Sequence, residues 1–198
     1  MGGRALVIAS AAILIVSLLA SGSAAGQVDG MGAAKSFKKF PVYWAGEEVA
    51  GFPLEDISSS SNGFTFFYGS CELAGTDHPS CAPPIEIQLF STCDRWANSY
   101  TVEKLFPFRG AMAYMYRPKP GEGIEIELSP FEIFTGRETV VVWVEPGGLK
   151  HPSEMRKVAL AVGRALRTVH QSQPPAKLPP PAKGTLGGTL PCQKPPAP

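Results

Sequence analysis

Apolar and polar residues alternate along several short segments of the chain, with the period of two that is typical of β-strands. In residues 63–69 (GFTFFYG), Phe64, Phe66 and Tyr68 fall on one face of the predicted strand. In residues 85–90 (IEIQLF), isoleucine and leucine alternate with glutamate and glutamine. Because one face of the second strand is polar, the pattern predicts a sheet with one solvent-facing side, which is commonly antiparallel.

The second half of the chain predicts a meander of strands joined by short turns. Residues 111–116 and 124–128 flank the sequence RPKPGEG, whose prolines and glycines favour a turn. Pro130 predicts a bend, after which the extended chain resumes over 131–135. Residues 139–144 (TVVVWV) are apolar throughout, which predicts a central strand.

Weaker patterns lie before and between these strands. Residues 40–44 (FPVYW) predict a short strand at a sheet edge, because proline lacks a backbone N–H. The residues that follow predict a loop ending in the turn-rich sequence SSSSN at 58–62. Residues 94–105 predict a short helix whose N-cap is Asp94.

A longer helix is predicted from Pro152 or Ser153 to Val169, because apolar residues recur there at steps of three and four. These apolar positions are Met155, Val158, Val162, Leu166 and Val169. An amphipathic helix that follows a meander can cover the apolar face of the sheet. The predicted fold class is therefore α+β, with an antiparallel sheet of about five to seven strands and one C-terminal helix packed on one face.

The N-terminus has the features of an export signal. Arg4 precedes the uncharged residues 5–20 (ALVIASAAILIVSLLA), and the small residues before Gly26 form a signal-peptidase site. We expect cleavage after Ala25, which makes residues 1–25 a signal peptide. The alternative is an uncleaved membrane anchor, since the extended run approaches the roughly 20 residues that span a bilayer. Either outcome places the rest of the chain outside the cytoplasm, secreted or held by one N-terminal transmembrane helix.

Composition divides the remaining chain into three parts. Residues 26–36 predict a flexible linker, and residues 37–170 predict one exported domain of ordinary size. Residues 171–198 contain nine of the twenty prolines of the chain, which favours extended segments over a packed core. We expect the protein to be a monomer.

Four cysteines in an exported chain predict two disulfides. The favoured pairing joins Cys71 to Cys81 across a loop and Cys93 to Cys192, which would strap the proline-rich tail to the domain. Four cysteines allow three pairings, so the connectivity stays open. Together with His78, three of these cysteines could instead bind zinc, but they lack the paired C-x2-C spacing of a strong zinc signal. No metal is expected.

Charge is distributed unevenly along the chain. Residues 26–150 contain 10 Lys and Arg against 16 Asp and Glu, whereas residues 151–198 contain 7 against 1. Two interpretations fit: the basic helix and tail lie against an acidic domain, or the basic segment meets anionic lipid or a wall polymer. Nucleic acid is not expected as a partner, because the cations are scattered and lack interleaved exposed aromatic residues.

No motif in the chain specifies a reaction or a cofactor. Ser70, Asp77 and His78 are residue types of a hydrolase triad, but the sequence G-x-S-x-G is absent. Glu125 and Glu127 could form a glycosidase pair, yet the solvent face of a strand explains them as well. No glycine-rich phosphate loop precedes a helix, and no cofactor is expected.

Aromatic residues are the remaining feature, on the strand that contains Phe67 and at Tyr114 and Tyr116. They either bind a sugar or peptide on an exposed face or fill the core that a small domain needs. The sequence favours a non-catalytic exported domain that binds a partner or envelope component, or has a structural role. The alternative is a secreted hydrolase with an unrecognised active site.

Overall fold

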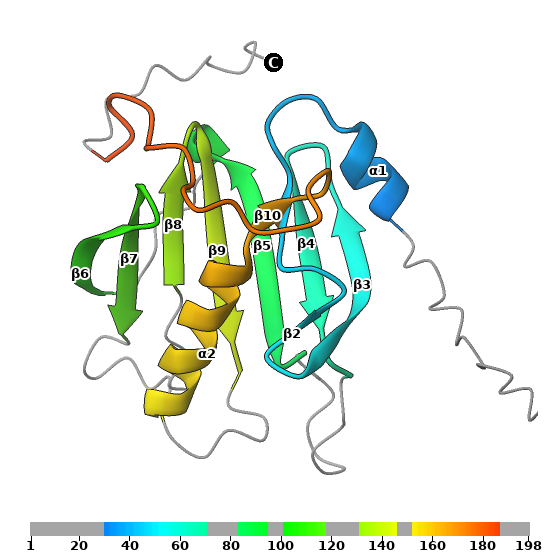
Figure 1. Ribbon diagram of the computed structural model, residues 1–198. Coiled ribbons are helices and arrows are strands. Elements are labelled where there is room, and N and C mark those ends of the chain that lie inside the picture. The colour runs from blue at the N-terminus through cyan, green and yellow to red at the C-terminus, as the bar shows by residue number, and fades with distance from the viewer. Residues whose placement is uncertain (1–29, 71–82, 95–100, 118–130, 146–151, 187–198) are drawn as a thin grey trace, which may run out of the picture.

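The computed structural model of the protein describes residues 30–70, 83–94, 101–117, 131–145 and 152–186. These residues form two layers: an eight-stranded antiparallel sheet, and a layer made by one long helix and the chain that follows it (Figure 1). The predicted α+β fold, with a C-terminal helix on one face of the sheet, is confirmed. The sheet has one strand more than the upper limit of the prediction.

Two four-stranded meanders meet in the middle of the sheet. The first contains β2 (Glu48–Val49), β3 (Phe52–Ser59), β4 (Gly63–Tyr68) and β5 (Ile85–Ser91). Each of these strands pairs with the next one in sequence. At the centre of the sheet, β5 pairs with the last strand of the second meander.

The second meander begins at the far edge of the sheet and returns to the centre. It contains β6 (Thr101–Phe108), β7 (Ala111–Arg117), β8 (Phe131–Thr135) and β9 (Glu138–Val144). The prediction of a central strand from the sequence TVVVWV is confirmed, because β9 lies between β5 and β8. The strand predicted at 124–128 lies outside the described residues.

The core lies between the sheet and the helix layer and follows the predicted alternation. One row of directly opposed residues crosses five strands, from β4 to β7. Its members are Phe66, Ile87, Val142, Phe131 and Met115. All five are at most 2 % exposed. Burial of such side chains contributes about 1.5–3 kcal/mol each, so rows of this kind hold the sheet against the second layer.

The helix α2 (Pro152–Ala165) packs on β8 and β9 (Figure 1). Its buried side chains are Met155, Ala159 and Val162. Gly163 brings the helix close to the sheet, because a Cβ atom at this position would lie 2.7 Å from the ring of Phe131. A larger residue at this position would push the helix off the sheet.

A second, two-stranded sheet explains why the helix ends before the predicted Val169. Directly after α2, β10 (Arg167–Thr168) pairs antiparallel with β1 (Tyr43–Trp44). The N–H of Val169 then donates to the carbonyl oxygen of Val42 at 2.9 Å. The strand predicted at 40–44 is therefore present for two residues, but in this small sheet and not at an edge of the large one.

Two further predictions were wrong. Residues expected to form a loop after β1 form β2 and β3, in which Leu54 and Ile57 are buried. The predicted helix over 94–105 is also absent: its described C-terminal part, from Thr101, begins β6, and a 3-10 turn, η1 (Thr92–Asp94), precedes it. In both β3 and β6 a register shift interrupts the pairing, so the sequence lacks a continuous period of two.

The described part of the predicted linker 26–36 contains a short helix, α1 (Met31–Ser36), with Ala34 buried. Gly30 precedes this helix with a φ of 97°, and a Cβ atom there would lie 2.6 Å from the carbonyl oxygen of Ile57. Glycine thus allows the chain to enter α1 in close contact with β3. The folded domain therefore begins before residue 37.

Candidate functional site

A groove opens at the end of the sheet where the β3–β4 and β8–β9 turns lie. Its main hollow has a volume of about 430 Å³ and is bounded by the segment after α1, the β8–β9 turn and the residues after β10. A smaller hollow of about 240 Å³ shares Lys39, Phe40 and Arg137 with it. We call the two hollows together the basic groove. Its ionisable lining residues are Lys38, Lys39, Asp94, Arg137, Glu138 and His170.

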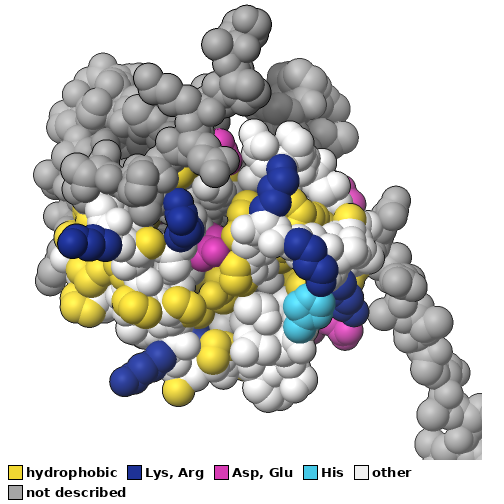
Figure 2. All heavy atoms as spheres, turned by 90° about the horizontal axis from the view of Figure 1, so that it is seen from above, with side chains coloured by type: hydrophobic (Ala, Val, Ile, Leu, Met, Phe, Trp, Pro, Cys, Tyr) yellow, Lys and Arg dark blue, Asp and Glu magenta, His cyan; other side chains and the backbone are white. Residues whose placement is uncertain are grey.

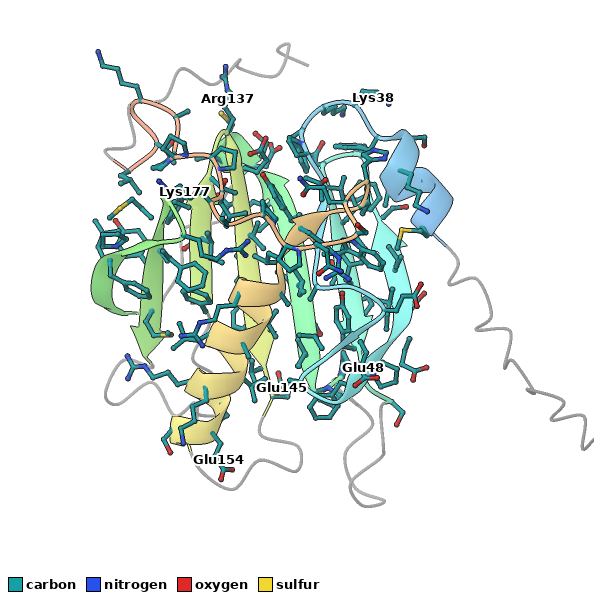
Figure 3. All side chains as sticks on the ribbon, in the orientation of Figure 1. Lys38, Glu48, Arg137, Glu145, Glu154 and Lys177 are labelled. Carbon is teal, nitrogen blue, oxygen red and sulfur yellow. The ribbon has the colours of Figure 1, made fainter. Side chains whose placement is uncertain are left out.

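Cationic side chains gather at this end of the molecule. Figure 2 looks onto this end and shows Lys and Arg side chains around a histidine. In Figure 3, Lys38, Arg137 and Lys177 lie at this end, whereas the three labelled glutamates lie at the opposite end. The three labelled cations therefore lie toward the end at which the groove opens, where the carboxylates of Asp94 and Glu138 also line the groove.

Aromatic packing fixes the segment that carries the two lysines. The rings of Phe37 and Phe40 meet edge to face with centroids 4.8 Å apart, and Phe37 meets Phe64 in the same way at 5.0 Å. The Nζ atom of Lys39 donates to the backbone oxygen of Ser61 at 2.8 Å, which ties the segment to the β3–β4 turn. Because an ammonium group has three donors, Lys39 can also donate to a ligand.

The β8–β9 turn places Arg137 and Glu138 in the groove. Gly136 has a φ of 59°, and a Cβ atom there would lie 2.7 Å from Oε2 of Glu138, so the turn requires glycine. The backbone N–H groups of Arg137 and Glu138 donate to the Glu138 carboxylate. Burial nevertheless raises the pKa of this carboxyl to about 6. Mild acidification therefore removes a negative charge from the groove.

A buried polar contact supports the turn from below. The hydroxyls of Tyr43 in β1 and Thr135 in β8 are hydrogen-bonded, and both side chains are at most 3 % exposed. Thr135 also donates to the carbonyl oxygen of Pro179 at 2.9 Å. Burial, and to a lesser degree the Glu138 carboxylate, raises the pKa of the Tyr43 phenol. Tyr43 is therefore a neutral structural group at ordinary pH and not a base.

The proline-rich tail holds the β8–β9 turn from the other side. The N–H of Gly136 donates to the carbonyl oxygen of Pro180 at 3.1 Å, and the N–H of Ala182 donates back to the oxygen of Gly136. The side chain of Leu178 is only 2 % exposed. The described part of the tail, residues 171–186, is therefore packed on the domain. Proline carbonyls remain free to accept hydrogen bonds, which is how a segment poor in N–H donors is held here.

Arg109, in the β6–β7 turn, joins the sheet, the helix and the tail. Its guanidinium donates to the carbonyl oxygens of Gly163 at 2.8 Å and Leu166 at 3.1 Å, and also to that of Pro175. The carbonyl oxygens at the end of a helix need such partners. Burial lowers the pKa of Arg109, but an arginine stays protonated in proteins. Arg109 is thus a structural clamp behind the groove.

The predicted disulfide residues are described only in part. Cys93 lies in η1, next to Asp94 of the basic groove, and is disulfide-bonded. Cys71, Cys81 and Cys192 lie outside the described residues, so the pairing stays a prediction.

The aromatic residues of the sheet divide between its two faces. The three inward-facing aromatic residues of β4 are buried, so for them the core interpretation is confirmed. Phe67 and Tyr114 are half-buried on the other face, where Tyr114 meets Phe134 edge to face at 5.3 Å. The side chain of Tyr116 is not among those described.

The residues considered for hydrolysis are not brought together by the described structure. Ser70 is exposed at the end of its segment, and Asp77, His78, Glu125 and Glu127 lie outside the described residues. In the described segments, no cluster of three or more His, Cys, Asp or Glu residues could hold a metal ion. None of the helices in these segments is long and apolar enough for a membrane crossing.

Comparison with known proteins adds no functional information, because no protein-family model, curated protein or solved structure matches the chain. Sequence reasoning also missed the basic groove. Lys39 lies in the segment after α1 and Arg137 in the β8–β9 turn, and no motif indicates that they meet. The only local signal was a pair of lysines between Phe37 and Phe40, a pattern that equally fits an exposed loop.

Proposed function

We propose that this protein is a non-catalytic domain that works outside the cytoplasm and binds an anionic group of an envelope component in its basic groove. The observation that supports this most is the convergence of Lys38, Lys39 and Arg137 on one hollow of about 430 Å³. These cations come from two segments far apart in sequence, which the fold brings together. Positive charge in a concave site attracts and retains anions.

The chemistry of the groove favours binding over catalysis. Tyr43 and Thr135 beneath it are structural, and the Glu138 carboxylate accepts hydrogen bonds from its own turn. A nucleophilic mechanism needs a nucleophile within hydrogen-bond reach of a base. The described lining residues of the groove contain lysine and arginine donors but no such pair.

Export is part of the proposal and rests on the N-terminal sequence. Arg4, the apolar residues 5–20 and the small residues that end at Ala25 have the order of a cleavable signal. Outside the cytoplasm, phosphate- and carboxylate-bearing polymers and lipids are the anionic partners that a basic groove would meet. The proposed ligand is the same whether the chain is free or anchored.

Calorimetric titration of the mature protein with tripolyphosphate tests the proposal. Arg137→Glu should weaken binding about tenfold or more, because it replaces an attraction of about 1.4 kcal/mol by a repulsion. Lys38→Glu, at an exposed position, should act in the same direction with little effect on folding. The matched control is Lys157→Glu on the exposed side of α2, which makes the same change in net charge and should alter affinity less than about twofold.

Two results would overturn the proposal. One is the absence of tripolyphosphate binding at low ionic strength. The other is an equal loss of affinity in the Arg137 and Lys157 variants, which would mean that the anion responds to net charge and not to the groove.

A further inference from the structure

A second hollow, lined mainly by neutral polar side chains together with the carboxylate of Asp94, continues the basic groove over the β3–β4 turn. It has a volume of about 240 Å³ and is lined mainly by hydroxyl and amide side chains of β3, the turn and β5. Its polar lining side chains include Ser58, Ser59, Ser60, Asn62, Gln88 and Asp94. We call it the polar hollow.

The polar hollow and the basic groove are continuous. Asn62 and Asp94 line both the polar hollow and the smaller hollow of the groove, in which they face Lys39 and Arg137. Lys39 also bonds to the backbone of Ser61 in the same turn. A ligand that reaches from one hollow into the other would therefore meet neutral polar groups at one end, the Asp94 carboxylate where the hollows join, and the cations Lys39 and Arg137 at the other end.

The side chains of the polar hollow suit a polyhydroxylated group. Serine hydroxyls and the amides of asparagine and glutamine can each donate and accept, as the hydroxyls of a sugar require. In the described structure the hydroxyls of Ser58 and Ser59 have no hydrogen-bond partner, and Gln88 uses one amide hydrogen on Glu86 at 3.1 Å. The half-buried ring of Phe90 adds an apolar surface against which a sugar face can pack.

We infer that the anionic ligand of this protein is a saccharide that carries a phosphate or carboxylate, with its sugar in the polar hollow and its acidic group at Lys39 and Arg137. This inference rests on the proposed function and narrows the ligand class. A ligand of this class accounts for the neutral polar side chains that lie beside the cations of the groove. A simple anion would gain nothing from the serines, Asn62 and Gln88 beside it.

Titration of the mature protein with inorganic phosphate, glucose and glucose 6-phosphate tests the inference. Glucose 6-phosphate should bind about tenfold more tightly than phosphate, because it fills both hollows. Asn62→Ala and Gln88→Met, made separately in the turn and in β5, should each lower the affinity for glucose 6-phosphate toward that for phosphate. Lys157→Glu serves as the control that should change neither.

The outcomes separate the two proposals. If phosphate binds and glucose 6-phosphate binds no better, the saccharide inference is wrong and the proposed function stands. If neither anion binds, the proposed function itself fails. Vesicles that contain phosphatidylinositol, compared with phosphatidylcholine alone, decide the source: co-sedimentation identifies a lipid headgroup, and binding of the soluble sugar phosphate alone identifies a polymer or free saccharide.

Discussion

The two ends of the sheet differ in charge and in construction. At one end, Lys38 and Arg137 line the basic groove, and Lys177 lies toward the same end (Figure 3). At the opposite end, the labelled acidic residues are Glu48, Glu145 and Glu154. The basic end joins the segment after α1, the β8–β9 turn and the tail through backbone hydrogen bonds. At the acidic end, the glutamates sit on β2, after β9 and at the start of α2, which are separate elements.

This difference indicates which end of the sheet is suited to binding a ligand. Cations at the open end of the groove attract an anionic partner before contact. Burial, and to a lesser degree the charge of Glu86, raises the pKa of Glu145. The basic end instead has a hollow in which one wall, the β8–β9 turn, is held by backbone hydrogen bonds to the tail. If those contacts hold the basic end together, mutations that remove them should lower the stability of the protein more than mutations of exposed residues.

The largest effect is expected from the disulfide at the basic end. We propose that Cys93 pairs with Cys192, which closes a loop of about 100 residues between η1 and the tail. Cys192→Ser should then lower the free energy of unfolding by about 4 kcal/mol, because the unfolded chain loses a long-range constraint. Chemical denaturation measures this change. Peptide mapping without reduction should show Cys93 linked to Cys192, and a link to Cys71 or Cys81 would refute the pairing.

The next effect concerns Arg109, whose guanidinium joins the β6–β7 turn to the end of α2 and to the tail. Arg109→Ala leaves three carbonyl oxygens of α2 and the tail without their charged donor, so we expect a loss of about 3 kcal/mol in the free energy of unfolding. Urea denaturation provides the measurement. Arg164→Ala, at an exposed position of α2, is the control and should cost less than about 0.5 kcal/mol. Equal losses in both variants would mean that Arg109 is not a clamp.

Two leucines of the tail allow a matched test of its docking. Leu178 is 2 % exposed and Leu186 is 39 % exposed. Leu178→Ala should destabilise the protein by about 2 kcal/mol and expose the tail to protease, because it empties a buried site. Leu186→Ala should cost less than about 0.5 kcal/mol. If thermal denaturation shows the same small effect for both, the tail is only a tether.

The smallest effect is the pH dependence at Glu138. Its pKa in the folded protein, about 6, exceeds the ordinary value of 4.5. Between these values the folded state binds more protons, so this group's contribution to stability is fully present below about pH 4.5 and falls as pH rises to about 6. Glu138→Gln should remove this slope from urea denaturation measured across the range. An unchanged slope would show that the carboxyl does not titrate there.

The same variant should affect binding. Protonation of Glu138 removes a negative charge near Lys38, Lys39 and Arg137, so tripolyphosphate should bind more tightly at pH 5 than at pH 7. The comparison belongs in a His170→Gln background, which removes the imidazole that lines the groove. Buried Tyr43 stays neutral throughout. In that background, Glu138→Gln should make the affinity almost independent of pH.

The large elements could be predicted because their sequence period is regular. The alternation at Phe64, Phe66 and Tyr68 and the apolar run of β9 identified strands correctly. The pattern failed at β3 and β6, since a register shift in each strand breaks the period of two. The apolar period also predicted wrongly that the helix extends to Val169. The backbone of Val169 instead pairs with that of Val42, a contact between distant segments that the period does not reveal.

The basic groove could not be predicted for a related reason. Its cations lie in turns and connecting segments, where apolar residues do not recur at a regular spacing from which structure could be predicted. The role of Arg109 depends on carbonyl groups of α2 and the tail, which no local pattern in the sequence identifies. The unequal distribution of charge was visible in the sequence, but it pointed to the basic C-terminal segment and not to Lys38, Lys39 and Arg137.

The most direct test of the account is a ¹H–¹⁵N NMR titration of the mature protein with tripolyphosphate. The account predicts saturable shifts for amides at the basic end, at residues 38–40, 61–62, 136–138 and 168–170, with little change at 47–49 and 153–155. It also predicts that Arg137→Glu removes these shifts while Lys157→Glu retains them. Shifts spread over α2 and the acidic end, or identical shifts in both variants, would contradict the claim that the groove is the binding site.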